Sequence, residues 1–253
     1  MKTSAFAGGL FVAIAATIPA QADPITTGLS LWLKADNGLA TDGSTWADQS
    51  GNGHNATAVQ GQAPTFVSSA INGLPAAHFS GAQRMSISGQ PVTSQHFTII
   101  VVATDESTQS HGDYCDVVSN WSGSTGVQSI FLGTVWKRPG NKFLDRIRFT
   151  DQIGGSDQDE QGVGRVKKPA NAFILSAVSA NKSARVYVDD KLQYDLGSKL
   201  KRRDLSAGWF LGDQGACACE YWLGDIAEVL IYDRALTTRE IETDAAYLKA
   251  KWQ

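Results

Sequence analysis

Aromatic and cationic side chains gather in the middle of this sequence, and both types of side chain can bind sugars. Trp136 is followed directly by the turn-forming segment Lys137–Gly140, which favours exposure of the indole ring. Arg146 and Arg148 alternate with apolar residues, so they share one face of a predicted strand. Sugar faces stack on indole rings, guanidinium groups bond to hydroxyls, and two neighbouring cations suit an acidic sugar. We therefore expect Trp136, Arg146, Arg148 and Trp222 to bind a glycan.

A short acidic segment, Ser156–Glu160, offers a candidate calcium site. Asp157 and Asp159 lie two residues apart, and Ca²⁺ takes about six to eight oxygen ligands. The segment lacks the EF-hand pattern, so a solvated polar loop is the alternative interpretation. We expect Asp157 and Asp159 to be Ca²⁺ ligands.

The sequence contains three cysteines, Cys115, Cys217 and Cys219, so one thiol is left over whichever bridge forms. In an oxidising compartment, a bridge from Cys115 to Cys217 or Cys219 would stabilise the fold by up to about 4–5 kcal/mol. A bridge between Cys217 and Cys219 themselves would close a small, strained ring. A zinc site that includes His111 is a further possibility, although the C-x-C spacing is not the usual one. We expect Cys115 to pair with Cys217 or Cys219.

Carboxylates and bases in the same part of the chain leave an enzymatic alternative open. A glycoside hydrolase needs two carboxylates, about 5–5.5 Å apart for retention or farther apart for inversion. The candidates are Asp157, Asp159, Glu160 and Glu220. A polysaccharide lyase needs a Tyr or His base beside a cation that neutralises a uronate, a role open to His111 or Tyr114 with the two arginines. The spacing of these residues does not choose between the two reactions.

The first 22 residues have the order of a secretory signal peptide. Lys2 precedes the apolar run Leu10–Ile18, and Ala20-Gln21-Ala22 then supplies the small residues that a signal peptidase needs. The run is too short to cross a bilayer, which takes about 20 apolar residues. We expect cleavage after Ala22, residues 23–253 as one exported domain, and no membrane span. The net charge of −3 gives no electrostatic reason for a nucleic-acid partner.

Short apolar segments separated by Gly, Asn, Asp and Ser predict an all-β, two-sheet antiparallel sandwich. The predicted strands are Leu29–Lys34, Ala76–Phe79, Met85–Ile87, Phe97–Ala103, Val127–Leu132, Leu144–Phe149, Ala172–Ser179, Arg185–Val188, Trp209–Leu211 and Asp225–Tyr232. One helix follows them. Thr237 and Glu240 form a capping box, and Ile241, Ala245, Leu248 and Trp252 then recur on one helical face.

Two segments resemble the LamG-like jelly-roll family of concanavalin A-like lectins and glucanases. The first contains Leu31-Trp32-Leu33-Lys34-Ala35-Asp36, Trp46-Ala47-Asp48-Gln49-Ser50-Gly51-Asn52-Gly53 and Phe79-Ser80-Gly81, and the second runs from Gly224 to Leu236. The resemblance implies a jelly-roll sandwich whose first and last strands lie side by side, with chiefly structural roles for Glu228 and Asp233. Many relatives carry calcium. The E-x-D-x-x-E motif of the family's glucanases is absent from this sequence.

These observations together predict an exported, lectin-like domain that recognises an extracellular glycan or polysaccharide. A polysaccharide-degrading enzyme on the same fold is the alternative, and an adhesive domain with a protein partner is a third interpretation. Measuring sugar retention and product formation side by side distinguishes them.

Overall fold

The computed structural model describes residues 23–108, 114–123, 130–138, 142–150, 163–167, 169–195, 202–217 and 219–253. For residues 135–138, 142–150, 163–167 and Tyr194 it describes the backbone alone. The signal peptide predicted over residues 1–22 lies outside these ranges and remains a prediction. In the described part of the chain, no helix has both the length and the apolar character needed to span a bilayer.

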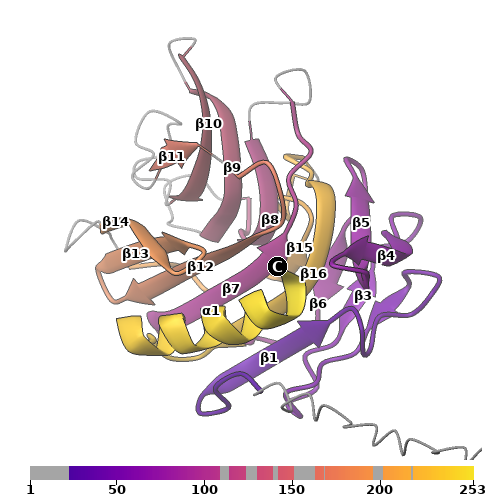
Figure 1. Cartoon of the computed structure of the whole chain (residues 1–253), viewed down its shortest axis with the longest axis horizontal. Coiled ribbons are helices and arrows are strands. Elements are labelled where there is room, and N and C mark those ends of the chain that lie inside the picture. The colour runs from indigo at the N-terminus through magenta and orange to yellow at the C-terminus, as the bar shows by residue number, and fades with distance from the viewer. Residues whose placement is uncertain are drawn as a thin grey trace, which may run out of the picture.

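The first sheet holds eight strands in the order β14-β13-β12-β7-β16-β5-β4, with β1 beside β16 (Figure 1). Its strands are β1 (Leu29–Lys34), β4 (Thr65–Ile71), β5 (Leu74–Ser80), β7 (His96–Ala103), β12 (Phe173–Ala180), β13 (Ser183–Val188), β14 (Lys191–Asp195) and β16 (Leu223–Tyr232). β16 pairs with β7 along one edge and with both β1 and β5 along the other. The first and last strands are therefore neighbours, as the resemblance implied.

The second sheet also holds eight strands, in the order β11-β10-β9-β8-β15-β6-β3-β2. Its strands are β2 (Thr45–Trp46), β3 (Ala56–Ala58), β6 (Met85–Ile87), β8 (Tyr114–Asn120), β9 (Ile130–Arg138), β10 (Lys142–Thr150), β11 (Val163–Lys167) and β15 (Trp209–Leu211). All strand ladders within the described residues are antiparallel in both sheets. The predicted two-sheet antiparallel sandwich is confirmed.

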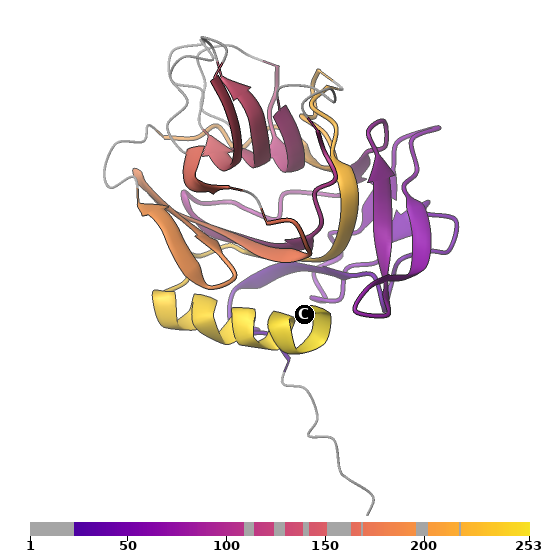
Figure 2. The same ribbon diagram turned by 45° about the horizontal axis from the view of Figure 1, so that its top comes forward.

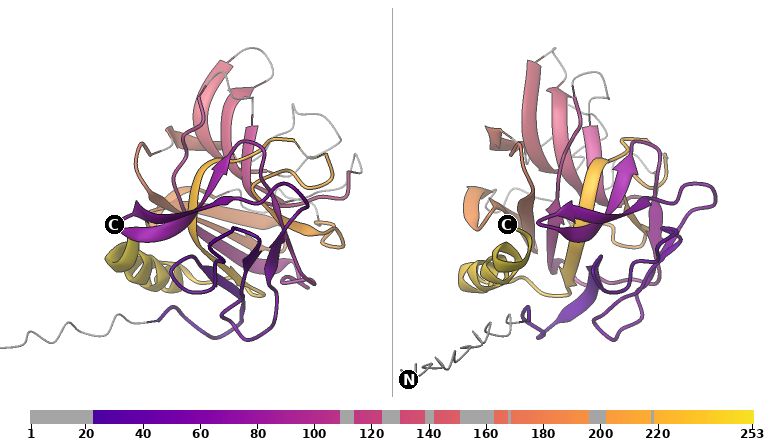
Figure 3. Two further views of the ribbon diagram at one scale, coloured as in Figure 1. Left: turned by 90° about the vertical axis from the view of Figure 1, so that its right-hand side faces the viewer. Right: turned by 45° about the vertical axis from the view of Figure 1, so that its right-hand side comes forward.

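The helix α1 (Thr238–Trp252) forms a third layer on the outer side of the first sheet (Figure 2). Both views in Figure 3 show α1 on the side of the molecule away from β8, β9 and β10. The capping box is present as predicted, because the Thr237 side chain accepts a hydrogen bond from the Glu240 backbone while the Glu240 carboxylate accepts one from the Thr237 backbone. The outer face of the second sheet is therefore the one that the helix leaves free.

Two apolar clusters follow from this three-layer arrangement. The larger cluster lies between the sheets and includes the fully buried Trp46, Trp209 and Trp222. The smaller one lies between the first sheet and α1, where Trp252 and Leu248 pack on strand residues such as Ile100. Side chains alternate along each strand of the first sheet, so one face of that sheet contributes to the larger cluster and the opposite face to the smaller one.

Two tight turns follow directly from their residue types. The Ser50 backbone donates to the Asp48 side chain over 2.9 Å, which closes an Asx turn. Asp189 and Asp190 connect β13 to β14 with φ angles of 50° and 73°. Positive φ at both central residues is what a two-residue turn needs to match the strand twist, and Asp tolerates it.

Candidate functional site

Two rows of paired residues cross β8, β9 and β10 on the second sheet. Tyr114 pairs with Val135 and Val135 with Arg146, while Asp116 pairs with Gly133 and Gly133 with Arg148. Directly opposed residues of antiparallel strands lie on the same face of a sheet. Cys115 and Val117 belong to the core between the sheets, so the alternating Tyr114 and Asp116 belong to the outer face. We call these two rows the second-sheet rows.

Gly133 is required where the second row crosses β9. A side chain at this position would collide with the carbonyl oxygen of Cys115, and its Cβ would lie 2.9 Å from the Cα atom of Asp116. β8 and β9 therefore approach more closely here than any other residue type would allow. Arg148 on β10 therefore pairs with a residue of β9 that has no side chain.

Of the four residues predicted to contact a sugar, three lie on strands of the second sheet and one lies in the core. Trp136 lies in β9, and Arg146 and Arg148 lie in β10, with their side chains outside the described part of the structure. Trp222 is fully buried in the core between the sheets. The expectation that Trp222 contacts a glycan is therefore wrong, because its indole ring has no face open to solvent. The sequence signal failed because an aromatic residue before a strand looks the same whether it is buried or exposed.

Around Asp116 and Ser119 of β8, and over the adjoining β15, the outer face of the second sheet is closed. Asp116 and Ser119 are fully buried, and Gly215 packs so closely on Phe210 that its Cβ would lie 3.0 Å from the ring. The Arg84 guanidinium covers the other part of this region, 4.6 Å from the Phe210 ring centroid. This cover closes the second row at Asp116, while Tyr114 in the first row is half-buried.

The buried ion pair between Arg84 and Asp213 anchors this cover. One guanidinium nitrogen of Arg84 lies 3.0 Å from the Asp213 carboxylate, and the Gly215 backbone donates to the same carboxylate over 3.0 Å. Burial raises the pKa of the Asp213 carboxyl to about 6, although the Arg84 charge acts to lower it. A carboxyl with that pKa resembles a general acid, but Asp213 is fully buried and so does not reach a substrate.

The disulfide joins Cys217 and Cys219. The expected bridge from Cys115 is therefore wrong, and the small ring is the one that forms. Cys115 is buried within β8, between the sheets, where its side chain belongs to the apolar core. The sequence argument favoured the long loop on chain entropy, which does not take account of where a strand directs its side chains.

Other predicted site residues fall outside the described ranges. Asp157, Asp159 and Glu160 lie there, so the calcium site stays a prediction, and so does the role of His111. Tyr114 is half-buried at the start of β8, and Glu220 is half-buried in the segment before β16.

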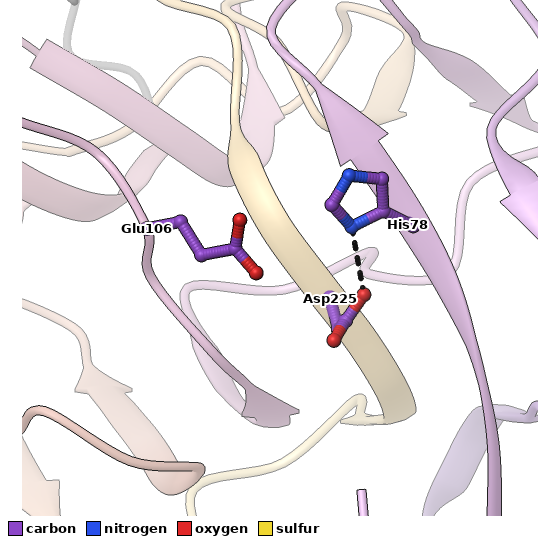
Figure 4. A group of neighbouring side chains, drawn as sticks. All are labelled: His78, Glu106 and Asp225. Carbon is purple, nitrogen blue, oxygen red and sulfur yellow. Dashed lines mark hydrogen bonds and ion pairs between the residues drawn. The ribbon is translucent and has the colours of Figure 1, made fainter. Parts of the chain in front are cut away.

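A second group of chemically active side chains lies on the first sheet. His78 on β5 and Asp225 on β16 are paired in the strand register, and His78 Nδ1 lies 2.9 Å from an Asp225 carboxylate oxygen. Glu106 follows β7 and turns its carboxylate toward the same pair (Figure 4). One ligand atom from each of the three residues lies within 4.8 Å of the others. An imidazole and two carboxylates in this arrangement can hold a metal ion or exchange protons.

A pocket of about 680 Å³ lies beside this group, against the C-terminal end of α1. Glu106 lines the pocket, as do the neighbouring residues Thr104 and Asp105. Asn171 and Gln253 add further polar atoms to the lining. The pocket and the three-residue group therefore share the segment that follows β7.

Sequence reasoning did not single out His78, Glu106 or Asp225. Both strands were predicted, and an isolated polar residue between Ala77 and Phe79 is a signal that His78 faces away from the core. The pairing of His78 with Asp225 spans 147 positions of the chain, and nothing local indicates it. A fold with β5 and β16 side by side was needed to bring the two side chains together.

Solved structures share this fold. Domain 4 of AbnA, a GH43 extracellular arabinanase from Geobacillus stearothermophilus solved in complex with arabinotriose, matches with a TM-score of 0.64 and 18% identity over 86% of this chain and 98% of that domain. Trypanosoma rangeli sialidase in complex with sialic acid matches with a TM-score of 0.58 and 17% identity, over 91% of this chain and 34% of the sialidase. The binding domain of Paraclostridial Mosquitocidal Protein 1 matches with a TM-score of 0.56 and 15% identity, over 89% and 53% of the two chains.

The comparisons establish the sandwich architecture and leave the role of individual residues to the structure. This chain spans about a third of the sialidase chain. No protein-family model matches the sequence, and no curated protein matches it.

Proposed function

We propose that this chain is an exported, glycan-binding domain of the LamG-like, concanavalin A-like jelly-roll type. The observation that carries the proposal is the register of β8, β9 and β10, which brings Tyr114, Arg146 and Arg148 into two adjacent rows on the sheet face that α1 leaves free. A tyrosine and two arginines supply the stacking surface and the hydrogen-bond donors that sugars need. The AbnA domain that matches this fold was solved with an arabinose oligosaccharide, which supports a sugar as the ligand.

In this proposal the glycan lies across β9 and β10. The cover over β8 and β15, formed by Arg84 and the segment around Gly215, sets one border of the binding surface. The two arginines in β10 supply the contacts, and Trp222 supplies none. Trp136 alternates with Val135 along β9, so its position falls outside the two rows. The paired positive charges favour a glycan with carboxylate or sulfate groups, because a guanidinium binds such groups through two parallel hydrogen bonds.

The row of Tyr114, Val135 and Arg146 also supports a second candidate function, that of a polysaccharide lyase. In such an enzyme a tyrosine removes the proton beside a uronate carboxylate, and a neighbouring cation neutralises the charge that develops. The register supports this role because it aligns Tyr114 and Arg146 in one row, two strands apart.

A glycan array with and without EDTA, run beside a product assay, tests the proposal. Retention of an intact acidic glycan supports the binding domain, and loss of retention in EDTA supports the predicted Ca²⁺ ligands Asp157 and Asp159. Absorbance from an unsaturated uronate would favour the lyase, and new reducing ends would favour a hydrolase. An array without any retained glycan, together with an absence of products, would contradict both functions and favour a protein partner.

A further inference from the structure

We propose that His78, Glu106 and Asp225 bind a divalent transition-metal ion, with Zn²⁺ as the ion that best fits the donor set. One imidazole and two carboxylates are borderline and hard donors, a combination that Zn²⁺ accepts. His78 and Asp225 lie on the first sheet and Glu106 follows its strand β7, whereas the proposed glycan surface lies on the second sheet, so the site is independent of that function.

The distances between the donor atoms suit a single ion. His78 Nδ1 and the Asp225 oxygen are 2.9 Å apart, and all three donor atoms lie within 4.8 Å of one another. Two ligands bound to Zn²⁺ at about 2.0–2.2 Å are separated by roughly 3–4 Å. The site therefore closes on an ion through a small shift of Glu106, whose side chain is exposed and free to move toward the pair.

Backbone hydrogen bonds hold the three ligand-bearing segments in place before any ion binds. The Thr104 backbone donates to the Asp225 carbonyl oxygen over 2.9 Å, and the Asp225 backbone donates to the Thr104 hydroxyl over 2.8 Å. The Glu106 backbone donates to the Leu223 carbonyl oxygen over 2.9 Å. Hydrogen bonds thus fasten the segment after β7, which carries Glu106, to the start of β16, which carries Asp225.

Gly224 permits this close approach. It has a φ of 136°, and a Cβ atom at this position would collide with the carbonyl oxygen of Thr104. A residue with a side chain would push the segment that carries Glu106 away from β16. The glycine next to Asp225 therefore has a direct role in bringing the two carboxylates together.

The charge of the group also favours a cation. Within the described part of the chain, His78 forms an ion pair with Asp225, and no Lys or Arg forms one with Glu106 or Asp225. Two carboxylates that share a single imidazole repel each other, and a divalent ion removes that repulsion. A simple structural ion pair between His78 and Asp225 would not need Glu106 beside it.

The position of the group beside a pocket determines what the ion can do. Three protein ligands leave a fourth coordination position on Zn²⁺ for water or for an incoming oxygen ligand. The pocket of about 680 Å³ borders the site through Thr104 and Glu106, and its lining includes Asn171 and Gln253. A small oxyanion or a sugar hydroxyl that enters this pocket is the class of ligand that the ion would take.

Isothermal titration of the chelator-treated protein with ZnCl₂ tests the proposal. We expect one equivalent of Zn²⁺ to bind, and we expect His78→Gln and Asp225→Asn each to raise the Kd at least tenfold. Glu106→Gln is the variant least able to disturb the fold, because this side chain is exposed, and it too should raise the Kd. His96→Gln changes an exposed histidine at the start of β7 and serves as the matched control, with an unchanged Kd.

Titration with CoCl₂ adds a readout of the ligands themselves. Bound Co²⁺ should give visible absorption bands that His78→Gln alters and His96→Gln leaves unchanged. The proposal is overturned if the wild-type protein binds no Zn²⁺, or if Glu106→Gln and His78→Gln bind it as tightly as the wild type while showing the wild-type circular dichroism spectrum.

Discussion

Glu228 should be a costly carboxylate to neutralise in this protein. It is fully buried on β16 and accepts four hydrogen bonds. One carboxylate oxygen accepts from Trp32 Nε1 over 2.6 Å and from the Tyr247 hydroxyl over 2.8 Å. The other accepts from Lys251 Nζ and from Trp252 Nε1, both over 2.8 Å. The side chain therefore ties β1, β16 and α1 together at one point.

The cost of Glu228→Gln follows from these contacts. A glutamine side chain has one oxygen and one NH₂ group, so it satisfies only one pair of donors. In the less costly orientation the oxygen keeps Lys251 and Trp252, and the Tyr247 hydroxyl reverses to accept from the NH₂ group. Trp32 Nε1 then loses a buried partner, which costs about 1–3 kcal/mol. Lys251 also loses a buried counter-charge and keeps only Asp36, at 2.8 Å, so the total reaches about 3–5 kcal/mol.

Urea unfolding followed by tryptophan fluorescence measures this difference. We expect the free energy of unfolding to fall by about 3–5 kcal/mol in Glu228→Gln. Glu242→Gln, at an exposed position of α1, is the matched control and should change it by less than about 0.5 kcal/mol. A loss below about 1 kcal/mol in Glu228→Gln would refute the reasoning, because it would mean that the four donors are satisfied without the carboxylate.

Two further predictions concern the cover on the second sheet. The folded state raises the pKa of Asp213 from its ordinary value to about 6, so it holds a proton that the unfolded state releases between about pH 4 and pH 6. The stability that this group contributes is therefore present at low pH and lost as the pH rises through that window. Between pH 4 and pH 7, the free energy of unfolding should fall by about 3 kcal/mol more in the wild type than in Asp213→Asn. The free energy of unfolding is measured in urea at each pH. An equal fall with rising pH in the two proteins would contradict this prediction. For the cysteines, alkylation of the unfolded, unreduced protein should label Cys115 alone, and trypsin should release residues 204–234 with Cys217 and Cys219 joined. A tryptic cross-link between that peptide and the one that contains Cys115 would show that the disulfide is wrongly placed.

The sequence predicted the sandwich class and its strongest elements, because local signals mark them. The apolar run Phe97–Ala103 became the central strand β7, and the capping box at Thr237 and Glu240 begins α1 where expected. The resemblance correctly placed the first strand beside the last. It also implied a structural role for Glu228, which the four hydrogen bonds confirm.

Strands with few apolar residues were missed. β4 (Thr65–Ile71) is largely exposed or half-buried, and β8 (Tyr114–Asn120) carries buried polar residues that break the apolar pattern. In both strands the pairing with neighbours, and not the local sequence, supplies the stability. The predicted strand Val127–Leu132 overlaps only the beginning of β9, which runs over Ile130–Arg138 and so includes Trp136.

The candidate sites depended on information that is not local. Trp222 and Trp209 have the same residue type as Trp136, and only the packing of the sheets shows that the first two are buried. The disulfide and the group formed by His78 and Asp225 depend on which strands are neighbours and which way their side chains point. These properties belong to the assembled sandwich, and residue types and spacing do not encode them separately.

Binding of a retained acidic glycan by charge-matched variants tests the central claim most directly. In affinity gel electrophoresis, Arg146→Gln with Arg148→Gln should weaken binding at least tenfold, since each lost hydrogen bond to a charged group costs about 1.5–3 kcal/mol. Arg239→Gln with Lys191→Gln removes the same charge from exposed positions elsewhere and should bind like the wild type. Wild-type binding by the Arg146 and Arg148 double variant, or an equal loss in both double variants, would contradict a glycan surface on β9 and β10.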